Sequence, residues 1–329
     1  MARQLSVKTN TWPLAGVFRI SRGARTEAHV VVATISDGEV SGQGECVPYP
    51  RYGESVESVM EQVRSAASAI ADGCSREELL TVIPAGAARN AVDCALLDFE
   101  AKSSGRPAWQ VAGLEHAPGP LTTAYSLSVD APEAMGEAAT AHASRPLLKI
   151  KLSGDGADVD RLEAIRAAAP QTRLIVDANE GWSPEAYSQI VGDLARLKVE
   201  MVEQPMPAGD DEALRGIDRP VPLCADESCH DTSTLEALVG KYDLINIKLD
   251  KTGGITEALR LKKQAEALGF KIMVGCMIGS SLAMAPAILV AQGAQVVDLD
   301  APLLLAEDQQ PALTYDGSIV HPAPPALWG

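Results

Sequence analysis

Aromatic residues are scarce in this chain of 329 residues, where Phe, Trp and Tyr together make up 4% of the sequence. Apolar residues of all kinds still reach 46%, so a large hydrophobic core is possible. That core has to be built mainly from Val, Leu, Ile and Ala. The length is generous for one domain and comfortable for two.

Positive charge is also in short supply. The chain has 28 Lys and Arg against 44 Asp and Glu, which gives a formal net charge of −16. Because such a chain repels phosphate backbones and anionic headgroups, we expect neither nucleic acid nor a membrane as a partner. An anionic small molecule remains compatible with this charge, since a bound metal and nearby lysines can reverse the field inside a pocket.

Long apolar runs and targeting segments are missing as well. No run approaches the ~18 residues of a membrane-spanning helix, and residues 1–18 lack the hydrophobic stretch of a signal peptide. The six cysteines form no CxxC pair, and Cys224 with Cys229 lacks the second pair of a zinc site. No Walker loop or GxGxxG supports nucleotide binding. We therefore expect a cytoplasmic protein with reduced thiols and a small-molecule partner.

The first third of the chain places β-strand signals before helical ones. Its early segments alternate in polarity or are rich in β-branched residues, and Asp37-Gly38 is a hairpin turn signal. Later segments place apolar residues at helical spacing. The predicted strands are 3–9, 28–36 and 41–48, and the predicted helices are 54–71, 76–83 and 86–103.

From about residue 120 the pattern changes to alternating strands and helices. Candidate strands recur every 22–28 residues or so, which is the length of one βα unit. Eight evenly spaced units favour a closed parallel barrel over a doubly wound open sheet. The candidate strands are 121–127, 147–152, 172–177, 199–203, 221–226, 243–249, 271–276 and 295–298.

Together these patterns predict an α/β protein of two parts. Residues 116–310 form a modified (β/α) TIM-type barrel, and residues 1–115 form an N-terminal α+β capping domain. The Pro-rich tail, residues 311–329, returns to complete the cap.

Three acids stand at the ends of successive candidate strands: Asp177 ends RLIVD, Glu203 ends VEMVE and Asp226 ends PLCAD. In a parallel barrel the carboxyl ends of the strands meet at one face, where active sites form. One such acid is usually a solvated residue or a helix cap, but three at equivalent positions indicate a shared ligand. Three oxygen donors with room for water or substrate suit Mg2+.

Two lysines belong to the same pattern. Lys151 lies near the end of the second candidate strand and Lys248 near the end of the sixth, so they face each other across an eight-stranded barrel. Lys149 shares the face of Lys151, and two like charges at close range resist joint protonation, which favours a base. A surface lysine is the plain alternative for Lys248, but its strand is apolar and runs into a Gly turn.

Opposed lysines beside a metal suit chemistry at a carbon next to a carboxylate. The metal stabilises an enediolate, one lysine removes the α-proton, and the other returns a proton on the opposite face. The outcome is racemisation or epimerisation, whereas β-elimination needs only one of the lysines.

The motifs KxK, VDAN, EQP, ADES and NIKLDKTGG, in this order, resemble the muconate-lactonizing subgroup of the enolase superfamily. The resemblance covers nearly the whole chain and implies a capped barrel with one Mg2+ per subunit on the three acids. It also implies acid/base roles for Lys151 and Lys248 and, by family habit, a homo-oligomer. Asn179 and Glu227, which closely follow two of the acids, are expected to support the metal ligands.

Two further segments indicate which substrate the site takes. Asp298 and Asp300 in VVDLDAP share one strand face, which suits an ammonium group, and a DxD here resembles the dipeptide epimerases. Arg19, Arg22 and Arg25 stand in a Gly-containing loop, and Arg25 is the one matched to the substrate's Glu side chain in bacterial L-Ala-D/L-Glu epimerases, whose sequences this chain resembles. We also expect Lys149 and the GCMIGSS segment, with Cys276 and Gly279, to bind substrate.

The sequence therefore predicts an Mg2+-dependent dipeptide epimerase that inverts the α-carbon of the C-terminal residue, with L-Ala-D/L-Glu as the expected substrate. The setting that the resemblance implies is the breakdown of murein peptides. The same scaffold also suits an o-succinylbenzoate synthase or an N-acylamino acid racemase. A catalytically silent, metal-dependent assembly protein is the third possibility, against which the intact pair of lysines argues.

Overall fold

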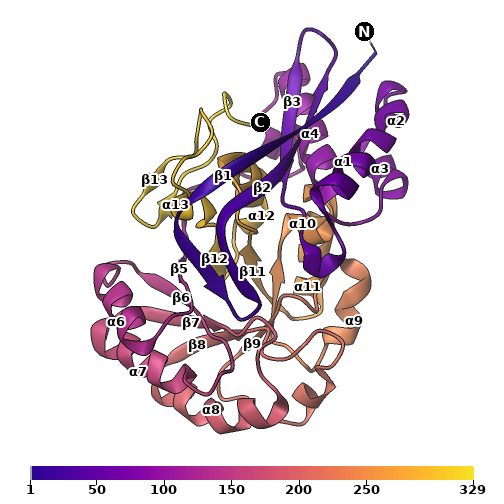
Figure 1. Ribbon diagram of the computed structural model, residues 1–329. Helices are drawn as coiled ribbons and strands as arrows, with labels where there is room; N and C mark the ends of the chain where they lie inside the picture. The colour runs from indigo at the N-terminus through magenta and orange to yellow at the C-terminus, as the bar shows by residue number, and fades with distance from the viewer. Residues whose placement is uncertain (1) are drawn as a thin grey trace.

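A long antiparallel hairpin joins the two halves of the molecule (Figure 1). The computed structural model describes residues 2–329, and within it strand β1 (Gln4–Ile20) pairs with β2 (Gly23–Ser36), which also pairs with β3 (Ser41–Cys46). The upper part of the hairpin belongs to the cap, and its tip reaches down over the barrel strands.

The hairpin is longer than the sequence predicted. The prediction that Arg19, Arg22 and Arg25 stand together in a loop is wrong, because most of this segment is strand. Arg19 lies in β1 and Arg25 in β2, and only Ser21 and Arg22 form the turn between them. In β1, half-buried residues such as Trp12, Phe18 and Ile20 alternate with exposed ones, but none is fully buried and Gly23–Glu27 are exposed, so the strand pattern is weak. Backbone pairing with a register shift between Pro13 and Phe18 holds it together.

The helices of the cap pack against its sheet. Helix α4 contacts β3 closely enough that a methyl group on Gly44 would lie 2.2 Å from the Ala91 carbonyl oxygen. Ser55 and Ser75 cap the N-termini of α1 and α3 by accepting hydrogen bonds from backbone amides. The elements are α1 (Val56–Ser65), α2 (Ala67–Ala71), α3 (Arg76–Val82), α4 (Ala87–Ser104) and α5 (Ala108–Val111), with the short helix η1 (Pro50–Tyr52) after β3.

Eight parallel strands form the barrel in chain order, which confirms the predicted fold class. Next to the first strand, the Ala124 amide donates to the Val297 carbonyl of the last one at 2.8 Å, so the sheet curls back on itself rather than lying open. The strands are β5 (Tyr125–Leu127), β6 (Leu147–Lys151), β7 (Arg173–Asp177), β8 (Val199–Glu203), β9 (Leu223–Ala225), β10 (Leu244–Ile247), β11 (Lys271–Gly275) and β12 (Val296–Asp298).

Aliphatic and sulfur-containing side chains fill the barrel interior, as the scarcity of aromatics requires. One buried layer takes a residue from each successive segment, including Ile175, Met201, Cys224 and Met273. The outer helices are α6 (Pro132–Ala141), α7 (Asp158–Ala168), α8 (Pro184–Arg196), η2 (Glu212–Arg215), η3 (Thr232–Thr234), α9 (Leu235–Leu238), α10 (Leu249–Thr252), α11 (Ile255–Ala267), α12 (Ser281–Ala291) and α13 (Ala301–Leu304). Among residues 2–329 no helix is long and apolar enough to span a membrane.

The predicted strand 121–127 is split in the structure. Its first part, β4 (Leu121–Thr122), leaves the barrel and pairs with β14 (Ile319–Val320), which pairs with β13 (Tyr315–Asp316). The tail then reaches α4, where the Trp328 indole donates to the Cys94 carbonyl at 3.2 Å. The tail thus contacts the cap, while the boundaries at 115 and 310 stay predictions.

Candidate active site

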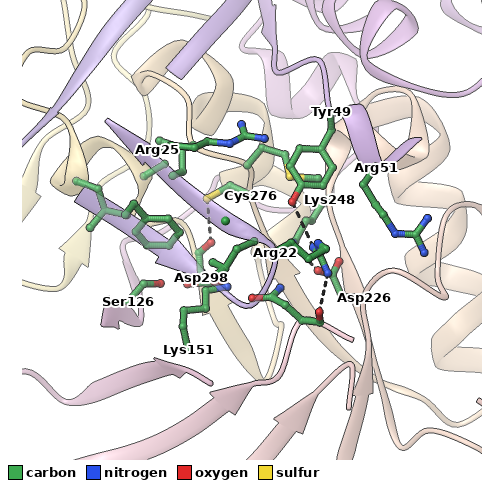
Figure 2. Close-up of a pocket in the computed structure, with 18 of the residues that line it drawn as sticks. Arg22, Arg25, Tyr49, Arg51, Ser126, Lys151, Asp226, Lys248, Cys276 and Asp298 are labelled. Atoms are coloured by element: carbon green, nitrogen blue, oxygen red, sulfur yellow. Dashed lines mark hydrogen bonds and ion pairs between the residues drawn. The ribbon is translucent and has the colours of Figure 1, made fainter. Parts of the chain in front are cut away.

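A cavity of about 480 Å3 lies between the carboxyl ends of the barrel strands and the hairpin tip. Figure 2 shows Arg25 and Tyr49 above it, on the cap side, and Lys151 and Asp226 below. Most residues expected from the sequence line this cavity: Arg25, Lys149, Lys151, Asn179, Asp226, Glu227, Lys248, Cys276, Asp298 and Asp300.

Three of the expected residues lie outside the lining. Asp177 and Glu203 are fully buried at the ends of β7 and β8, where Lys149 contacts both carboxylates. Gly279 packs against the cap, and a methyl group there would lie 3.0 Å from Glu45 Oε1. The cavity therefore includes Cys276, Met277 and Ile278 of that segment and stops short of Gly279.

The three carboxylates lie on neighbouring strands at one level of the barrel. Asp177 pairs in register with Glu203, and Asp226 directly follows β9. Each side chain is at most 2% exposed. Burial of three like charges so close together is stable only with cations between them.

Lysine ammonium groups meet these carboxylates in the structure. Lys151 Nζ donates to Asp177 Oδ2 and Lys248 Nζ donates to Asp226 Oδ2, both at 2.6 Å. Lys149 Nζ lies 2.7 Å from Glu203 Oε2 and 2.7 Å from Asp298 Oδ2. Lys151 ends β6, the second strand, and Lys248 directly follows β10, the sixth, so they approach the cavity from opposite sides of the barrel.

Sequence reasoning missed two residues that hold the carboxylates. Lys251 Nζ donates to Asp226 Oδ1 at 2.6 Å, and Asn246 Nδ2 donates to Glu203 Oε1 at 2.7 Å. Both lie within the NIKLDKTGG segment, whose charged and amide residues could have signalled them. Lys251 is 2% exposed, so its charge is fixed beside Asp226 rather than solvated.

Burial and these partners set the protonation states. Burial opposes the charge on Asp177, but Lys151 and Lys149 outweigh it and lower its pKa to about 2. Burial, and then the Asp177 charge, raise the pKa of Glu203 to about 7. Burial also disfavours the Lys248 ammonium, yet Asp226 and Glu203 raise the pKa of Lys248 well above its ordinary value.

The donor set fits a hard divalent cation. Carboxylate and amide oxygens are preferred by Mg2+, and Asn179 Oδ1 is buried without a hydrogen-bond partner. Within residues 2–329, no three His, Cys, Asp or Glu side chains are already spaced as a metal-binding group. The lysine ammonium groups lie between the acids. A cation bound there would therefore neutralise part of the carboxylate charge that the lysines neutralise in this structure.

One end of the cavity is acidic. Asp298 Oδ2 accepts from Lys149 Nζ, whereas Asp298 Oδ1 is buried without a partner. Asp300 Oδ2 accepts from the Ser126 amide at 2.7 Å, and burial followed by the Asp298 charge raises the pKa of Asp300 to about 7. The Cys276 thiol donates to the Asp298 carbonyl at 3.2 Å.

The opposite wall carries three arginines, two of which are paired with carboxylates. Arg22 contacts Glu227 at 2.6 Å and Glu180 at 3.1 Å, and Arg51 forms a two-point contact with Glu180. Arg25 has no carboxylate partner among the described residues, and its guanidinium lies 5.2 Å from the centre of the Tyr49 ring. Arg19, by contrast, contacts Asp130 outside the cavity.

Comparison with known families shows which family has this architecture. Residues 2–113 match the N-terminal domain of mandelate racemase and muconate lactonizing enzyme, and residues 133–321 match the enolase C-terminal domain-like family. The chain belongs to the mandelate racemase and muconate-lactonizing family of the enolase superfamily. The resemblance read from the motifs is therefore confirmed.

Two relatives within this family are similar over almost their entire length. L-Ala-D/L-Glu epimerase of Escherichia coli is 45% identical over 97% of this chain and 99% of its own. N-acetyl-D-glutamate racemase of a Pseudoalteromonas species is 46% identical over 91% of this chain and 95% of its own.

Solved structures of the superfamily agree with the fold. An enolase family member from Agrobacterium tumefaciens, with homology to dipeptide epimerases and bound sodium and L-Ala-L-Glu, is 54% identical with a TM-score of 0.98. The structural match covers 99% of this chain and 100% of the chain from Agrobacterium tumefaciens. A dipeptide epimerase from Enterococcus faecalis, complexed with Mg and L-Leu-L-Tyr, is 28% identical with a TM-score of 0.91, and each chain is covered to 98%.

Proposed function

We propose that this protein is a dipeptide epimerase that inverts the α-carbon of the C-terminal residue in L-Ala-L-Glu and L-Ala-D-Glu. The observation that carries the proposal is the pair Lys151 and Lys248, which reach one cavity from opposite strands of the barrel. Two positioned bases on opposite faces of one carbon are what inversion requires. The similarity to epimerases over the full chain supports this assignment.

Asp177, Glu203 and Asp226 would hold one Mg2+, with Asn179 and Glu227 beside them. When bound, this ion supplies positive charge that stabilises the carbanion formed next to the substrate carboxylate. The oxygen donors favour Mg2+, and relatives with Mg or sodium beside a dipeptide support a cation in this role.

The two lysines move the proton. One lysine, as a neutral amine, takes the α-proton, and the electron pair of the broken C–H bond moves into the carboxylate. The other lysine, as an ammonium, then donates a proton to the opposite face, which inverts the centre without a net change of atoms. Removal of either lysine interrupts this sequence.

The ends of the cavity select the substrate. Asp298, with its unpartnered buried oxygen, and Asp300 accept the ammonium of the N-terminal Ala. Arg25, which has no protein carboxylate to pair with in residues 2–329, binds the Glu side chain by two parallel hydrogen bonds. Lys149 holds Asp298 in place, and Cys276 holds its backbone.

The second candidate is an N-acylamino acid racemase that acts on N-acetylglutamate, and the 46% identical racemase favours it. Both substrates carry the same Glu carboxylates and differ at the amino end. The unpaired Asp298 oxygen suits an ammonium better than an acetyl group, because a buried carboxylate without a donor is costly. We therefore rank the dipeptide first, with cytoplasmic murein peptide breakdown as its setting and a homo-oligomer as its expected assembly.

Proton NMR in D2O separates the two functions. The protein with Mg2+ is incubated in parallel with L-Ala-L-Glu and with N-acetyl-L-Glu. We expect the Glu α-proton signal of the dipeptide to disappear as the L-Ala-D-Glu signals grow, with much slower change of the acetyl compound. Faster exchange of N-acetyl-L-Glu would assign the racemase function instead, and exchange of neither compound would refute both.

A further inference from the structure

Tyr49 lies where the cap loop meets the hairpin tip, and it contacts two of the three arginines that line the cavity, Arg22 and Arg25. Its ring lies under the Arg25 guanidinium, 5.2 Å from ring centre to the central carbon. Its hydroxyl accepts from Arg22 Nη2 at 3.2 Å. Figure 2 shows the Arg25 side chain extending toward this ring above the cavity.

Tyr49 is itself fixed from several directions. Its backbone amide donates to Glu54 Oε2 at 3.0 Å, and the other oxygen of Glu54 accepts from the first amide of α4 at 2.8 Å. Its ring lies 5.5 Å from the Tyr52 ring. Through Glu54, the backbone that carries the Tyr49 ring is therefore connected to the N-terminus of α4.

Arg22 connects this surface to the barrel. Its guanidinium donates to Glu227 Oε1 at 2.6 Å, to the Asn179 carbonyl at 2.7 Å and to Glu180 at 3.1 Å. The contact between Arg22 and Glu227 is charge-assisted, because it joins a guanidinium to a carboxylate. Since Glu227 is 2% exposed, its end of the contact is shielded from water. Arg22 is three residues from Arg25, so the same contacts fix the hairpin tip that carries Arg25.

We propose that Tyr49 is a specificity-determining positioning residue, which holds the Arg25 guanidinium over its ring so that the N–H donors of Arg25 face the side-chain carboxylate of the substrate. Stacking uses the face of the guanidinium and leaves the donors of its edge free. Arg22 locks Tyr49 and the hairpin tip onto the barrel. This inference rests on the proposed function, in which Arg25 binds the Glu side chain.

The experiment compares L-Ala-L-Glu with its neutral isostere L-Ala-L-Gln in steady-state epimerisation. The variants are Tyr49→Leu, which removes the aromatic face, Tyr49→Phe, which keeps it, and Arg25→Gln. Arg19→Gln is the control, because Arg19 lies in the same hairpin but contacts exposed Asp130. Thermal unfolding of every variant checks that each one is folded.

We expect Tyr49→Leu to lower the Glu-over-Gln ratio of kcat/KM by about 2- to 5-fold, the worth of an exposed cation–π contact. The loss should lie in KM for L-Ala-L-Glu, with kcat and the Gln dipeptide unchanged. Tyr49→Phe should keep the ratio within about 2-fold, since its ring remains, and Arg19→Gln should match the wild type. Arg25→Gln should abolish the preference.

Each failure points to a different step. An unchanged ratio in Tyr49→Leu with a collapsed ratio in Arg25→Gln overturns the role of Tyr49 alone. Equal losses in Tyr49→Leu and Tyr49→Phe also overturn it, because the ring would then be irrelevant. A wild-type protein that does not distinguish Glu from Gln overturns the proposed substrate and the role of Tyr49 together.

Discussion

At the scale of single residues, the site is an alternation of buried acids and lysines. Lys149 contacts three carboxylates, and Lys248 and Lys251 share Asp226 between them. Each of these charges is therefore held by a partner of opposite sign from another strand or turn. Such pairing positions side chains firmly, because the loss of one partner would leave the other buried and unpaired.

Asp298 offers the sharpest test at this scale. Replacement of Asp298 by Asn keeps its size but removes the charge that would attract a substrate ammonium. We expect kcat/KM for L-Ala-L-Glu to fall about 10- to 100-fold, in line with the loss of a charge-assisted hydrogen bond, while any activity on N-acetyl-L-Glu changes little. Kinetics on both compounds measure this, and an equal loss on the two would show that Asp298 does not bind the ammonium.

At the scale of elements, the contact between β3 and α4 fixes the cap. Gly42 and Gly44 bring the strand so close to the helix that a methyl group on either would lie 2.2 Å from the α4 backbone. Tyr49 follows β3 by three residues, so the position of this strand also determines where the cap loop meets the cavity.

Gly44→Ala should therefore destabilise the protein by roughly 3 kcal/mol, because the clash is with backbone and cannot be relieved by a rotamer change. Chemical denaturation measures the change. Gly16→Ala is the matched control, since a methyl group there meets nothing within 4 Å. If both variants unfold at the same denaturant concentration, the close approach of β3 and α4 is not a source of stability.

At the scale of the whole molecule, buried carboxyl groups join the cap to the barrel. Asp250 of α10 accepts from the Val47 amide at 3.0 Å and from the Asn90 side chain of α4 at 2.8 Å. Burial raises its pKa from 3.8 to about 7. Glu45 makes a similar link to Ser280, and burial raises its pKa to about 7.

These raised pKa values predict how stability depends on pH. Because the folded protein holds the Asp250 proton more tightly than the unfolded chain, the stabilisation is full below about pH 4 and is lost as pH rises toward 7. The slope approaches ~1.4 kcal/mol per pH unit for one group. Asp250→Asn keeps the neutral acceptor and should flatten the unfolding free energy over this range, whereas exposed Glu61→Gln should not. Parallel slopes in all three proteins would contradict this account.

The sequence predicted the barrel well because its period is regular. Eight βα units of similar length and a charged residue at successive strand ends mark the fold, and the same positions predicted that Asp177, Glu203 and Asp226 would lie close together. The hairpin extension was missed because no residue of β1 is fully buried and Gly23–Glu27 are exposed, so the alternation of half-buried and exposed positions is weak. Lys251 was missed because the side-chain direction in the short helix α10 cannot be read from spacing, and Asn246 because it lies inside strand β10 rather than at a strand end like the three acids.

Contacts between residues far apart in the sequence, at the hairpin tip, were the second feature that the sequence could not predict. That Arg22 meets Glu227 and that Tyr49 lies under Arg25 depends on how the hairpin bends over the barrel. The register shift between Pro13 and Phe18 contributes to this bend, and no local pattern announces it. The resemblance already pointed to Arg25, and the structure adds that Arg22 is paired with Glu227 whereas Arg25 has no carboxylate partner among the described residues.

The two-lysine mechanism is the central claim, and isotope exchange in single variants tests it most directly. Lys151→Ala and Lys248→Ala are incubated separately with L-Ala-L-Glu and L-Ala-D-Glu in D2O with Mg2+, and proton NMR follows the Glu α-proton. We predict that neither variant epimerises at more than about a hundredth of the wild-type rate, and that each still exchanges one diastereomer, with the two variants exchanging opposite ones. Epimerisation by both variants, or exchange of the same diastereomer by both, would contradict proton transfer between two opposed lysines.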